Sequence, residues 1–396
     1  MRLLWVATKP PWPAIDGGRL LLAETMEAVA RLGHELHLVA PLAERRPAPD
    51  APAGFAAGRC VPHLVRTPRR SALALVPSLW NAAPITIARH SHEALRAEVA
   101  RLVETTAFDV VHAEQVQAFA QCRPALERRI PVVLRAQNVE SDLWAGVATC
   151  RRGWRPLAAR EGARVAAYEA AAVRHAAATV ALTRRDAGRL ARLVGSHSAI
   201  HHVAAPFAER MPAGAALEGR PALVLLANRG WFPSVDGARW FLDTAWPIVR
   251  YRLPEARLHL FGLDGRGWRA AGVVNHAAPA ASVDAFPADA TLIVPLRIAS
   301  GVRMKILEAW ARGLPVVATP AAVAGLEATP DRELLVARDG EQFAAALDTL
   351  MTNRARRDAI VDHARAFLRA HHDPATIAAQ LVAIAENVAS AARARR

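Results

Sequence analysis

The sequence predicts an α/β protein built from two doubly wound domains, each with a parallel sheet covered by helices. Short apolar runs alternate with helix-length segments along all 396 residues. The apolar runs lack a strict polar–apolar alternation, which is typical of strands that are covered on both faces. The succession of strand-like and helix-like segments stops after about residue 204 and starts again near residue 222. A length of 396 residues is ordinary for two domains.

Each half of the chain contains its own series of strand-like and helix-like segments. In the first half the predicted strands are 3–8, 35–40, 109–113, 131–136 and 178–183, and the helices are 19–32, 92–103 and 155–175. In the second half the predicted strands are 222–227, 257–262, 291–296 and 315–319, and the helices are about 236–251, 302–312 and 340–350, followed by a long helical region over about 354–392. Alternating segments of this kind are typical of doubly wound domains, which bind ligands beyond the carboxyl ends of their strands.

The expected boundaries follow from composition. Residues 1–205 form the first domain, and an Ala-, Pro- and Gly-rich linker covers 206–221. Residues 222–375 form the second domain, and we expect 376–396 to be a C-terminal helix that returns to the first. The two domains would face each other across a cleft.

Bulk composition limits the cellular setting. The three cysteines, Cys60, Cys122 and Cys150, show no CxxC or metal-ligand spacing, which favours a reducing compartment. The first eight residues predict a strand rather than a secretory signal, and no apolar run reaches about 18 residues, the length of a transmembrane helix. We therefore expect a cytoplasmic protein.

The net charge of +14 raises the question of an anionic partner. Basic residues are spread along the chain without a nucleic-acid motif, so we expect no nucleic-acid partner. An anionic membrane surface at the inner face is favoured by two basic clusters, the second with an aromatic anchor; ordinary solvated arginines are the alternative. The clusters are Arg66, Arg69 and Arg70, and Arg151, Arg152, Trp154 and Arg155.

The most informative segment is 295–320, PLRIASGVRMKILEAWARGLPVVATP. It runs from an apolar strand through the small loop 299–301 into a helix that carries Arg303, Lys305 and Glu308 near its start. Backbone N–H groups at a helix N-terminus form a site for phosphate, and the two cations add positive charge. Glu308 can accept hydrogen bonds from sugar hydroxyls. The combination indicates a nucleotide-sugar site.

The choice of lysine strengthens this interpretation. Of 50 basic residues only Lys9 and Lys305 are lysines, so a lysine in this loop is less easily explained as a random surface charge. A solvated lysine without a partner is the alternative. No GxGxxG follows the first strand, no P-loop or G-x-S-x-G motif occurs, and no metal-ligand cluster is present, so neither a cofactor nor a metal is expected.

At this point the chain resembles the retaining glycosyltransferases of family 4, which have the two-domain GT-B fold of Rossmann-like domains. The block 301–309, GVRMKILEA, is similar to the GTRLKILEA block of one subgroup. The resemblance implies that Glu308 holds the ribose hydroxyls and that Arg303 and Lys305 hold the diphosphate. Backbone amides of Ser300, Gly301 and Val302 would hold sugar or phosphate oxygens. The family's first acidic residue, eight positions before Glu308, falls on Ser300.

Other segments resemble the family with substitutions. Residues 227–236 are similar to a G-x-M-x-W-x-P-N-x-D segment, in which Asn228 and Arg229 would approach the donor, and Ala227 replaces the glycine. Arg229 either adds charge for the phosphates or points to water. The loop with Gly17 and Gly18 would lie near the donor phosphate.

In the first domain the resemblance places three further segments near the cleft. His112 ends a DVVH strand and either lines the cleft or is a buried structural histidine. Residues 134–144 resemble LRxHNVExxxW, with Gln137 in place of the usual histidine, which is commonly an active-site residue near the transferred sugar. Glutamine can hydrogen-bond but cannot exchange protons near neutral pH. Asn138 and Glu140 are retained on the acceptor side.

The resemblance therefore implies transfer of a sugar from a nucleotide-diphosphate donor, with retention, to a glycan or lipid-linked acceptor in cell-surface polysaccharide synthesis. Two alternatives remain at the level of sequence. One is a nucleotide-sugar epimerase on the same fold, and the other is a non-catalytic sugar-nucleotide binder, which the changes at Gln137 and Ala227 favour.

Overall fold

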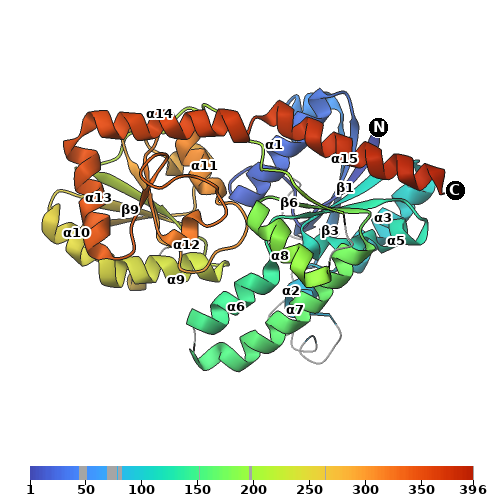
Figure 1. The fold of residues 1–396 in the computed structure, drawn as a ribbon, viewed down its shortest axis with the longest axis horizontal. Coiled ribbons are helices and arrows are strands. Elements are labelled where there is room, and N and C mark those ends of the chain that lie inside the picture. The colour runs from blue at the N-terminus through green and yellow to red at the C-terminus, as the bar shows by residue number, and fades with distance from the viewer. Residues whose placement is uncertain are drawn as a thin grey trace.

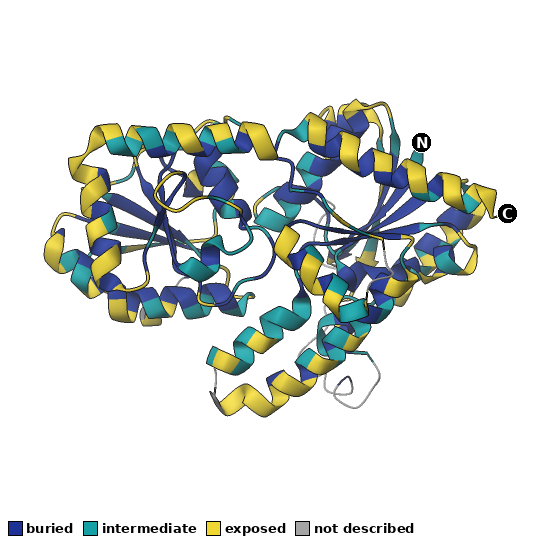
Figure 2. Ribbon diagram, viewed as in Figure 1, coloured by how far each residue is buried: buried dark blue, intermediate teal, exposed yellow. Residues whose placement is uncertain are grey.

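The computed structural model describes residues 1–43, 51–68, 78, 83–150, 152–195, 199–263 and 265–395. These residues form two lobes, each with a central parallel sheet and helices on its faces (Figure 1). The strands are the most deeply buried elements, and the helices expose their outer sides (Figure 2). The predicted fold class, two doubly wound α/β domains, is confirmed.

The N-terminal sheet has the strand order β3-β2-β1-β4-β5-β6-β7 among the described residues. Its strands are β1 (Arg2–Val6), β2 (Glu35–Ala43), β3 (Cys60–Thr67), β4 (Val110–Glu114), β5 (Val132–Ala136), β6 (Ala178–Ala181) and β7 (Ile200–His202). The helices of this domain are α1 (Gly17–Arg31), α2 (Ile85–Ala88), α3 (Glu93–Thr105), α4 (Val116–Phe119), α5 (Arg123–Glu127), α6 (Glu140–Cys150), α7 (Arg155–His175) and α8 (Arg184–Val194). The sequence predicted the five inner strands and missed the two edge strands, β3 and β7.

The C-terminal sheet has the order β10-β9-β8-β11-β12-β13. Its strands are β8 (Ala222–Leu226), β9 (Arg257–Phe261), β10 (Val273–His276), β11 (Thr291–Val294), β12 (Val316–Ala318) and β13 (Leu335–Val336). The helices are α9 (Phe232–Trp240), α10 (Trp246–Arg252), α11 (Met304–Ala311), α12 (Pro320–Val323), α13 (Gly340–Thr352), α14 (Arg354–His371) and α15 (Pro374–Ala394). The sequence again predicted the inner strands alone. The predicted helical region over about 354–392 consists of two helices, α14 and α15, which are separated by a short interruption between His371 and Pro374.

The last helix, α15, lies on the N-terminal domain, beside α1 (Figure 1). Its apolar residues Ile377 and Leu381 share a buried cluster with Leu22 and Met26 of α1. Among the described residues, one helical stretch, 354–394, is long and apolar enough to cross a membrane by length and composition alone. The apolar stripe of α15 is instead used against the N-terminal domain.

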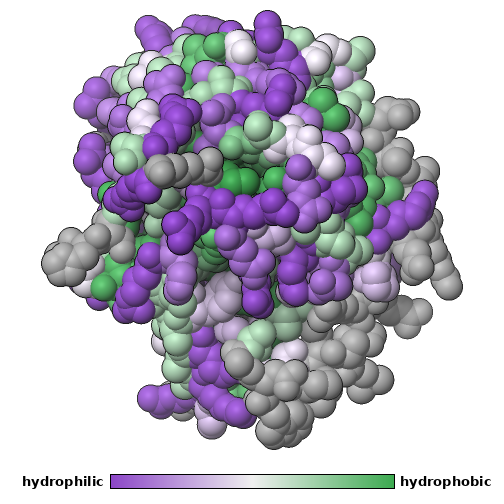
Figure 3. All heavy atoms as spheres, turned by 90° about the vertical axis from the view of Figure 1, so that its right-hand side faces the viewer, coloured by the Kyte–Doolittle hydropathy of each residue, from purple (hydrophilic) through white to green (hydrophobic). Residues whose placement is uncertain are grey.

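The segment predicted as a linker, 206–221, is packed rather than loose. Phe207 is buried in an apolar cluster to which both domains contribute, and Met211 N–H donates to the carbonyl of Ala311, 2.9 Å away. Figure 3 shows the end of the molecule that carries the N-terminal domain, where hydrophilic side chains are spread among smaller hydrophobic patches.

Candidate functional site

The loop between β11 and α11 lies against the N-terminal domain. Gly301 has φ +73°, and a Cβ at this position would lie 2.1 Å from the carbonyl oxygen of Gln137. Glycine is therefore required here both by the backbone conformation and by the close approach of the β5–α6 turn. The loop thus brings Ser300 and Gly301 of one domain to Gln137 and Asn138 of the other.

Polar contacts join the two domains at this loop. Gly301 N–H donates to Oδ2 of Asp186 on α8, at 2.9 Å. Ser300 Oγ accepts from Val139 N–H at 2.8 Å and lies 3.4 Å from Asp186 Oδ1. With its amide nitrogen as the donor, Asn138 lies 2.9 Å from the Ser300 carbonyl oxygen. The Gly301 amide that the sequence assigned to a ligand oxygen therefore holds a carboxylate oxygen from Asp186, a residue that the sequence analysis missed.

Arg303 precedes α11 and is only 4% exposed. Its Nη2 donates to the carbonyl oxygens of Ser300 and Gly301, whereas its buried Nη1 has no hydrogen-bond partner among the described residues. Burial lowers the pKa of Arg303 to about 10, although the nearby Asp186 opposes the shift. A buried guanidinium with an open donor is suited to receive an anion.

Lys305 lies on the same helix, one residue beyond its first. Its Nζ donates to the carbonyl oxygen of Leu226 at 2.8 Å. Burial, together with the charge of Arg303, lowers its pKa to about 8. Neither Arg303 nor Lys305 forms a direct ion pair with a described carboxylate, so the start of α11 carries two positive charges, with Asp186 as a nearby negative charge.

Glu308 is 5% exposed and rigidly held. Its Oε1 accepts from Ser282 Oγ and from Nε and Nη2 of Arg312, at 3.1 and 2.9 Å for the two nitrogens. The described residues make no hydrogen bond to Oε2. One carboxylate oxygen is therefore used to fix the side chain, and the other remains as an acceptor for a hydroxyl group.

The start of α1 meets the start of α11. A Cβ on Gly17 would lie 2.8 Å from the Cβ of Met304. Asp16 caps α1, because its Oδ1 accepts from the N–H groups of Gly18 and Arg19 at 3.1 Å. Lys9 Nζ lies 2.5 Å from the same oxygen. Lys9 was not among the predicted site residues, yet the scarcity of lysine that drew attention to Lys305 applies equally to it.

A chain of hydrogen bonds runs along the carboxyl ends of the inner N-terminal strands. Thr8 Oγ1 donates to Gln115 Oε1, at 2.8 Å. Gln115 Nε2 donates to Gln137 Oε1, and Gln137 Nε2 donates to Glu114 Oε1, both at 2.7 Å. Gln115 has φ 73° and ψ 153°, a backbone conformation that residues other than glycine rarely adopt. The amide orientation of Gln137 is thus fixed by its neighbours.

His112 is 1% exposed and stacks on the ring of Trp5, with centroids 4.2 Å apart. Burial, with a contribution from Arg135, lowers its pKa to about 3. These observations support the structural alternative for His112 over a place in the cleft. Glu140 begins α6, and burial raises its pKa.

Asn228 and Arg229 lie in an exposed turn after β8. Asn228 Oδ1 accepts from Gly230 N–H at 2.8 Å, which closes the turn. The turn begins two residues after Leu226, whose carbonyl binds Lys305. Asn228 and Arg229 are therefore near the start of α11 through the chain, with their side chains toward the surface.

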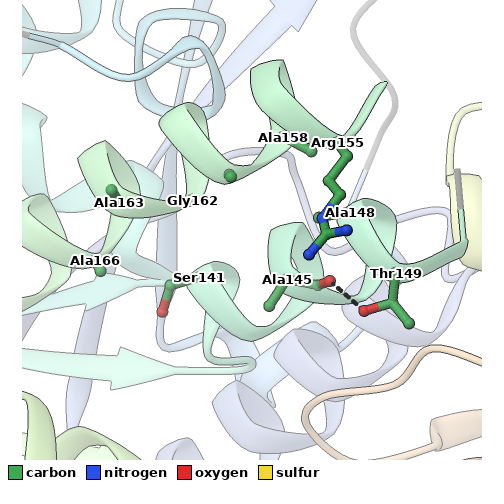
Figure 4. A pocket seen from close by; sticks show the side chains of 10 residues that line it. Ser141, Ala145, Ala148, Thr149, Arg155, Ala158, Gly162, Ala163 and Ala166 are labelled. Carbon is green, nitrogen blue, oxygen red and sulfur yellow. Dashed lines mark hydrogen bonds between the residues drawn. The ribbon is translucent and has the colours of Figure 1, made fainter. Parts of the chain in front are cut away.

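A separate groove of about 640 Å³ lies between α6 and α7, which project together from the N-terminal domain (Figures 1 and 4). Small side chains form most of its walls. It is lined by Ser141, Ala145, Ala148, Thr149, Arg155, Ala158, Ala159, Gly162, Ala163 and Ala166. Near the tip of this hairpin, Trp154 is 54% exposed. Of the basic clusters, Arg69, Arg70 and Arg151 lie outside the described residues.

Comparisons with known proteins place this geometry in context. Residues 239–383 match a family described as glycosyl transferase-like. No curated protein matches the chain in sequence. Among solved structures, a sucrose-phosphate synthase from Thermosynechococcus elongatus has a TM-score of 0.70 at 15% identity, over 98% of this chain and 99% of the other.

Two further structures are similar over nearly the whole chain. Anabaena HepE in complex with UDP-glucose has a TM-score of 0.63 at 13% identity, over 98% of this chain and 100% of HepE. A putative UDP-N-acetylglucosamine 2-epimerase from Listeria monocytogenes has a TM-score of 0.58 at 11% identity, over 96% and 94%. The chain thus has a GT-B-like fold, and its residues 239–383 match a glycosyl transferase-like domain.

Proposed function

We propose that this protein is a retaining glycosyltransferase that moves a sugar from a nucleotide-diphosphate donor to a glycan or lipid-linked acceptor. One observation carries the proposal: Arg303 and Lys305 concentrate positive charge, uncompensated by a carboxylate ion pair, at the start of α11. Glu308, one turn along the same helix, keeps one carboxylate oxygen for a hydroxyl. A diphosphate and an adjacent ribose need these two kinds of partner.

The chemistry follows from where charge develops. As the bond between the sugar carbon and the diphosphate breaks, negative charge grows on the leaving oxygens. Preorganised donors at that position stabilise the transition state more than the ground state. Arg303 Nη1 and Lys305 Nζ are such donors, and we expect them to receive the diphosphate in place of a metal ion. The contact between the domains would exclude water from the sugar.

The donor class is supported by the match to a glycosyl transferase-like domain and by the presence of UDP-glucose in the similar HepE structure. The transferred group is proposed to be a hexosyl unit. The exposed Trp154 and Arg155 near the tip of the α6–α7 hairpin favour an anionic membrane surface as a second partner. We therefore propose a cytoplasmic, peripheral protein that acts in polysaccharide synthesis.

An epimerase and a non-catalytic sugar-nucleotide binder are the two alternatives to a transferase, and the reaction products distinguish the three. An epimerase on this fold is favoured by the similar Listeria structure, and a non-catalytic binder is favoured by Gln137, whose amide oxygen and nitrogen are each held by a neighbour, Gln115 and Glu114. Incubation with a panel of UDP-, GDP- and ADP-sugars, followed by mass spectrometry and NMR, distinguishes the three. Transfer or donor hydrolysis supports our proposal, inversion at C2 supports the epimerase, and binding without turnover supports the non-catalytic protein.

The site assignment is tested with Lys305→Ala and Glu308→Ala. Both variants should lose at least 100-fold in turnover, the loss expected when a transition-state donor or a substrate anchor is removed. Far-UV circular dichroism checks that they remain folded, and Arg369→Ala serves as a control because Arg369 forms an exposed ion pair with Glu209. Full activity in both site variants would show that the donor binds elsewhere.

A further inference from the structure

The block that resembles family 4 lacks one acidic residue. The position eight residues before Glu308 is Ser300, which cannot supply a carboxylate. The structure nevertheless places a carboxylate at this position. Asp186, 114 residues earlier in the chain, brings its Oδ1 to 3.4 Å from Ser300 Oγ and its Oδ2 to 2.9 Å from Gly301 N.

The local structure holds Asp186 in this position. Thr183 is the N-cap of α8, and its Oγ1 accepts from the backbone N–H of Asp186 at 2.9 Å. Asp186 is therefore fixed in the first turn of the helix, where a carboxylate is also favoured by the helix dipole. Its side chain points away from its own domain, toward the loop that precedes α11.

The carboxylate of Asp186 is buried, with 2% of the residue exposed, and has no direct ion-pair partner among the described residues. Burial raises its pKa, and the effect is opposed by a hydrogen bond from the Thr183 side chain, by the charge of Arg303 and by the hydrogen bond from Gly301. An ionised carboxylate has about four acceptor positions, and the donors from Thr183, Ser300 and Gly301 occupy three of them, so one is left for a further donor.

We propose that Asp186 supplies, from the N-terminal domain, the carboxylate that Ser300 lacks, and that it binds a hydroxyl of the donor's sugar. This inference rests on the proposed function. A sugar hydroxyl donates to a carboxylate in a charge-assisted hydrogen bond, which is stronger than a neutral one. The Gly301 N–H, released from Asp186, then donates to a sugar oxygen. The sugar would thus be held by both domains, while Arg303, Lys305 and Glu308 of the C-terminal domain bind the nucleotide.

The experiment compares two ligands that differ only in the sugar. Calorimetry gives the Kd for UDP-glucose and for UDP, or for the matching pair that the donor panel selects. Asp186→Asn should weaken binding of the nucleotide sugar about tenfold or more, the value of a hydrogen bond to a charged group, and change Kd for the nucleoside diphosphate less than twofold. An equal effect on both ligands, or on neither, would overturn the inference.

A double variant tests by rescue whether a carboxylate at this position binds the sugar. Asp186→Ala combined with Ser300→Glu returns a carboxylate to the loop from the C-terminal domain. This double variant should recover most of the nucleotide-sugar affinity that Asp186→Ala loses. Failure to recover any affinity, in a double variant that still binds the nucleoside diphosphate normally, would contradict the proposed role.

A matched control separates sugar binding from contact between the domains. Arg184, also on α8, forms an ion pair with Glu327 of the C-terminal domain at 3.2 Å. Arg184→Ala removes a contact between the domains without removing the carboxylate, so it should leave the difference between the two ligands unchanged. If the wild-type protein binds no nucleotide sugar of the panel, the proposed function fails. If it does bind one and Asp186→Asn binds it equally well, only the present inference fails.

Discussion

Two polar regions lie near the domain interface, one in each domain, and they differ in how their charged side chains are paired. In one region the charges form an ion pair, and in the other the cations bind backbone carbonyl oxygens. In the N-terminal region, Glu114 and Arg135 are an almost fully buried ion pair, 3.6 Å apart, and Glu114 also accepts from Trp5 and Gln137. In the C-terminal region, Arg303 and Lys305 donate to backbone carbonyls and form no ion pair with a described carboxylate.

This difference indicates a division of labour. A buried ion pair that is also hydrogen-bonded gives a fixed geometry, but it leaves no charge for a ligand. Cations held only by carbonyl oxygens keep their positions and retain their charge. We therefore expect changes in the N-terminal region to reduce stability, and changes in the C-terminal region to reduce ligand binding and turnover.

The largest expected effect is on stability, from Arg135→Met. This change leaves the Glu114 carboxylate buried without its counterion, which should lower the free energy of unfolding by about 3–5 kcal/mol. Urea denaturation measures the change, and nucleotide affinity of the folded fraction should be unaltered. Adding Glu114→Gln should restore part of the lost stability. If the single variant were as stable as the wild type, the ion pair would not be a structural element.

Arg303→Ala should act on turnover rather than on stability. Removing one preorganised donor to a developing oxyanion typically lowers kcat by about 10²–10³-fold. Arg303→Lys keeps the charge but loses the guanidinium, whose Nη2 donates to both loop carbonyls while Nη1 stays open, so it should recover only part of the rate. Steady-state kinetics at saturating donor measures both variants. A wild-type kcat in Arg303→Ala would place the leaving group elsewhere.

The pH dependence of binding should report on Lys305, whose pKa is lowered to about 8 by burial and by Arg303. Its charged form predominates below pH 8 and its neutral form above, so affinity for a nucleoside diphosphate should fall as pH rises. Between pH 7 and pH 9 the charged fraction drops about tenfold, and Kd should rise by a similar factor. Lys305→Arg should abolish this dependence, because arginine stays charged. A flat profile in the wild type would show that Lys305 does not contact the phosphates.

The smallest effect concerns Gln115, whose backbone has a conformation that favours glycine. Gln115→Ala and Gln115→Gly both remove the hydrogen bonds to Thr8 and Gln137, but only glycine relieves the strain. The glycine variant should therefore be more stable than the alanine variant by about 1 kcal/mol, after the entropy cost of glycine is deducted. Thermal unfolding compares the two. A less stable glycine variant would mean that the backbone at this position is not strained.

The sequence predicted the inner strands because they are covered on both faces and appear as apolar runs. It missed β3, β7, β10 and β13, which are the four outer strands of the two sheets. An outer strand such as β7, with the sequence IHH, is partly solvated and too short to show an apolar period. Pattern alone therefore describes the centre of each sheet better than its edges.

The candidate site was predictable where it is local in sequence. The block 300–308 combines loop, cations and carboxylate within one strand–helix connection, so spacing alone indicates its chemistry. Asp186 was missed because its relation to Gly301 depends on how two separate domains meet, and no periodicity in the chain encodes that contact. His112 shows the reverse case, because the residue predicted at a strand end lies in the middle of β4, where it is buried and stacks on Trp5.

Because α15 returns to the N-terminal domain, the polypeptide crosses between the domains twice, near residues 205 and 372. Hydrogen bonds join the two crossing segments. Phe207 N–H donates to the carbonyl of His372 at 2.8 Å, and His372 Nδ1 lies 2.7 Å from the carbonyl oxygen of Ala205. Two linked crossing segments allow one domain to rotate relative to the other about a single axis. They oppose twisting of the domains and sliding of one domain along the other. If the domains separate to admit a substrate, they should therefore rotate about an axis near residues 205 and 372. The parts of the two domains farthest from that axis should move the most.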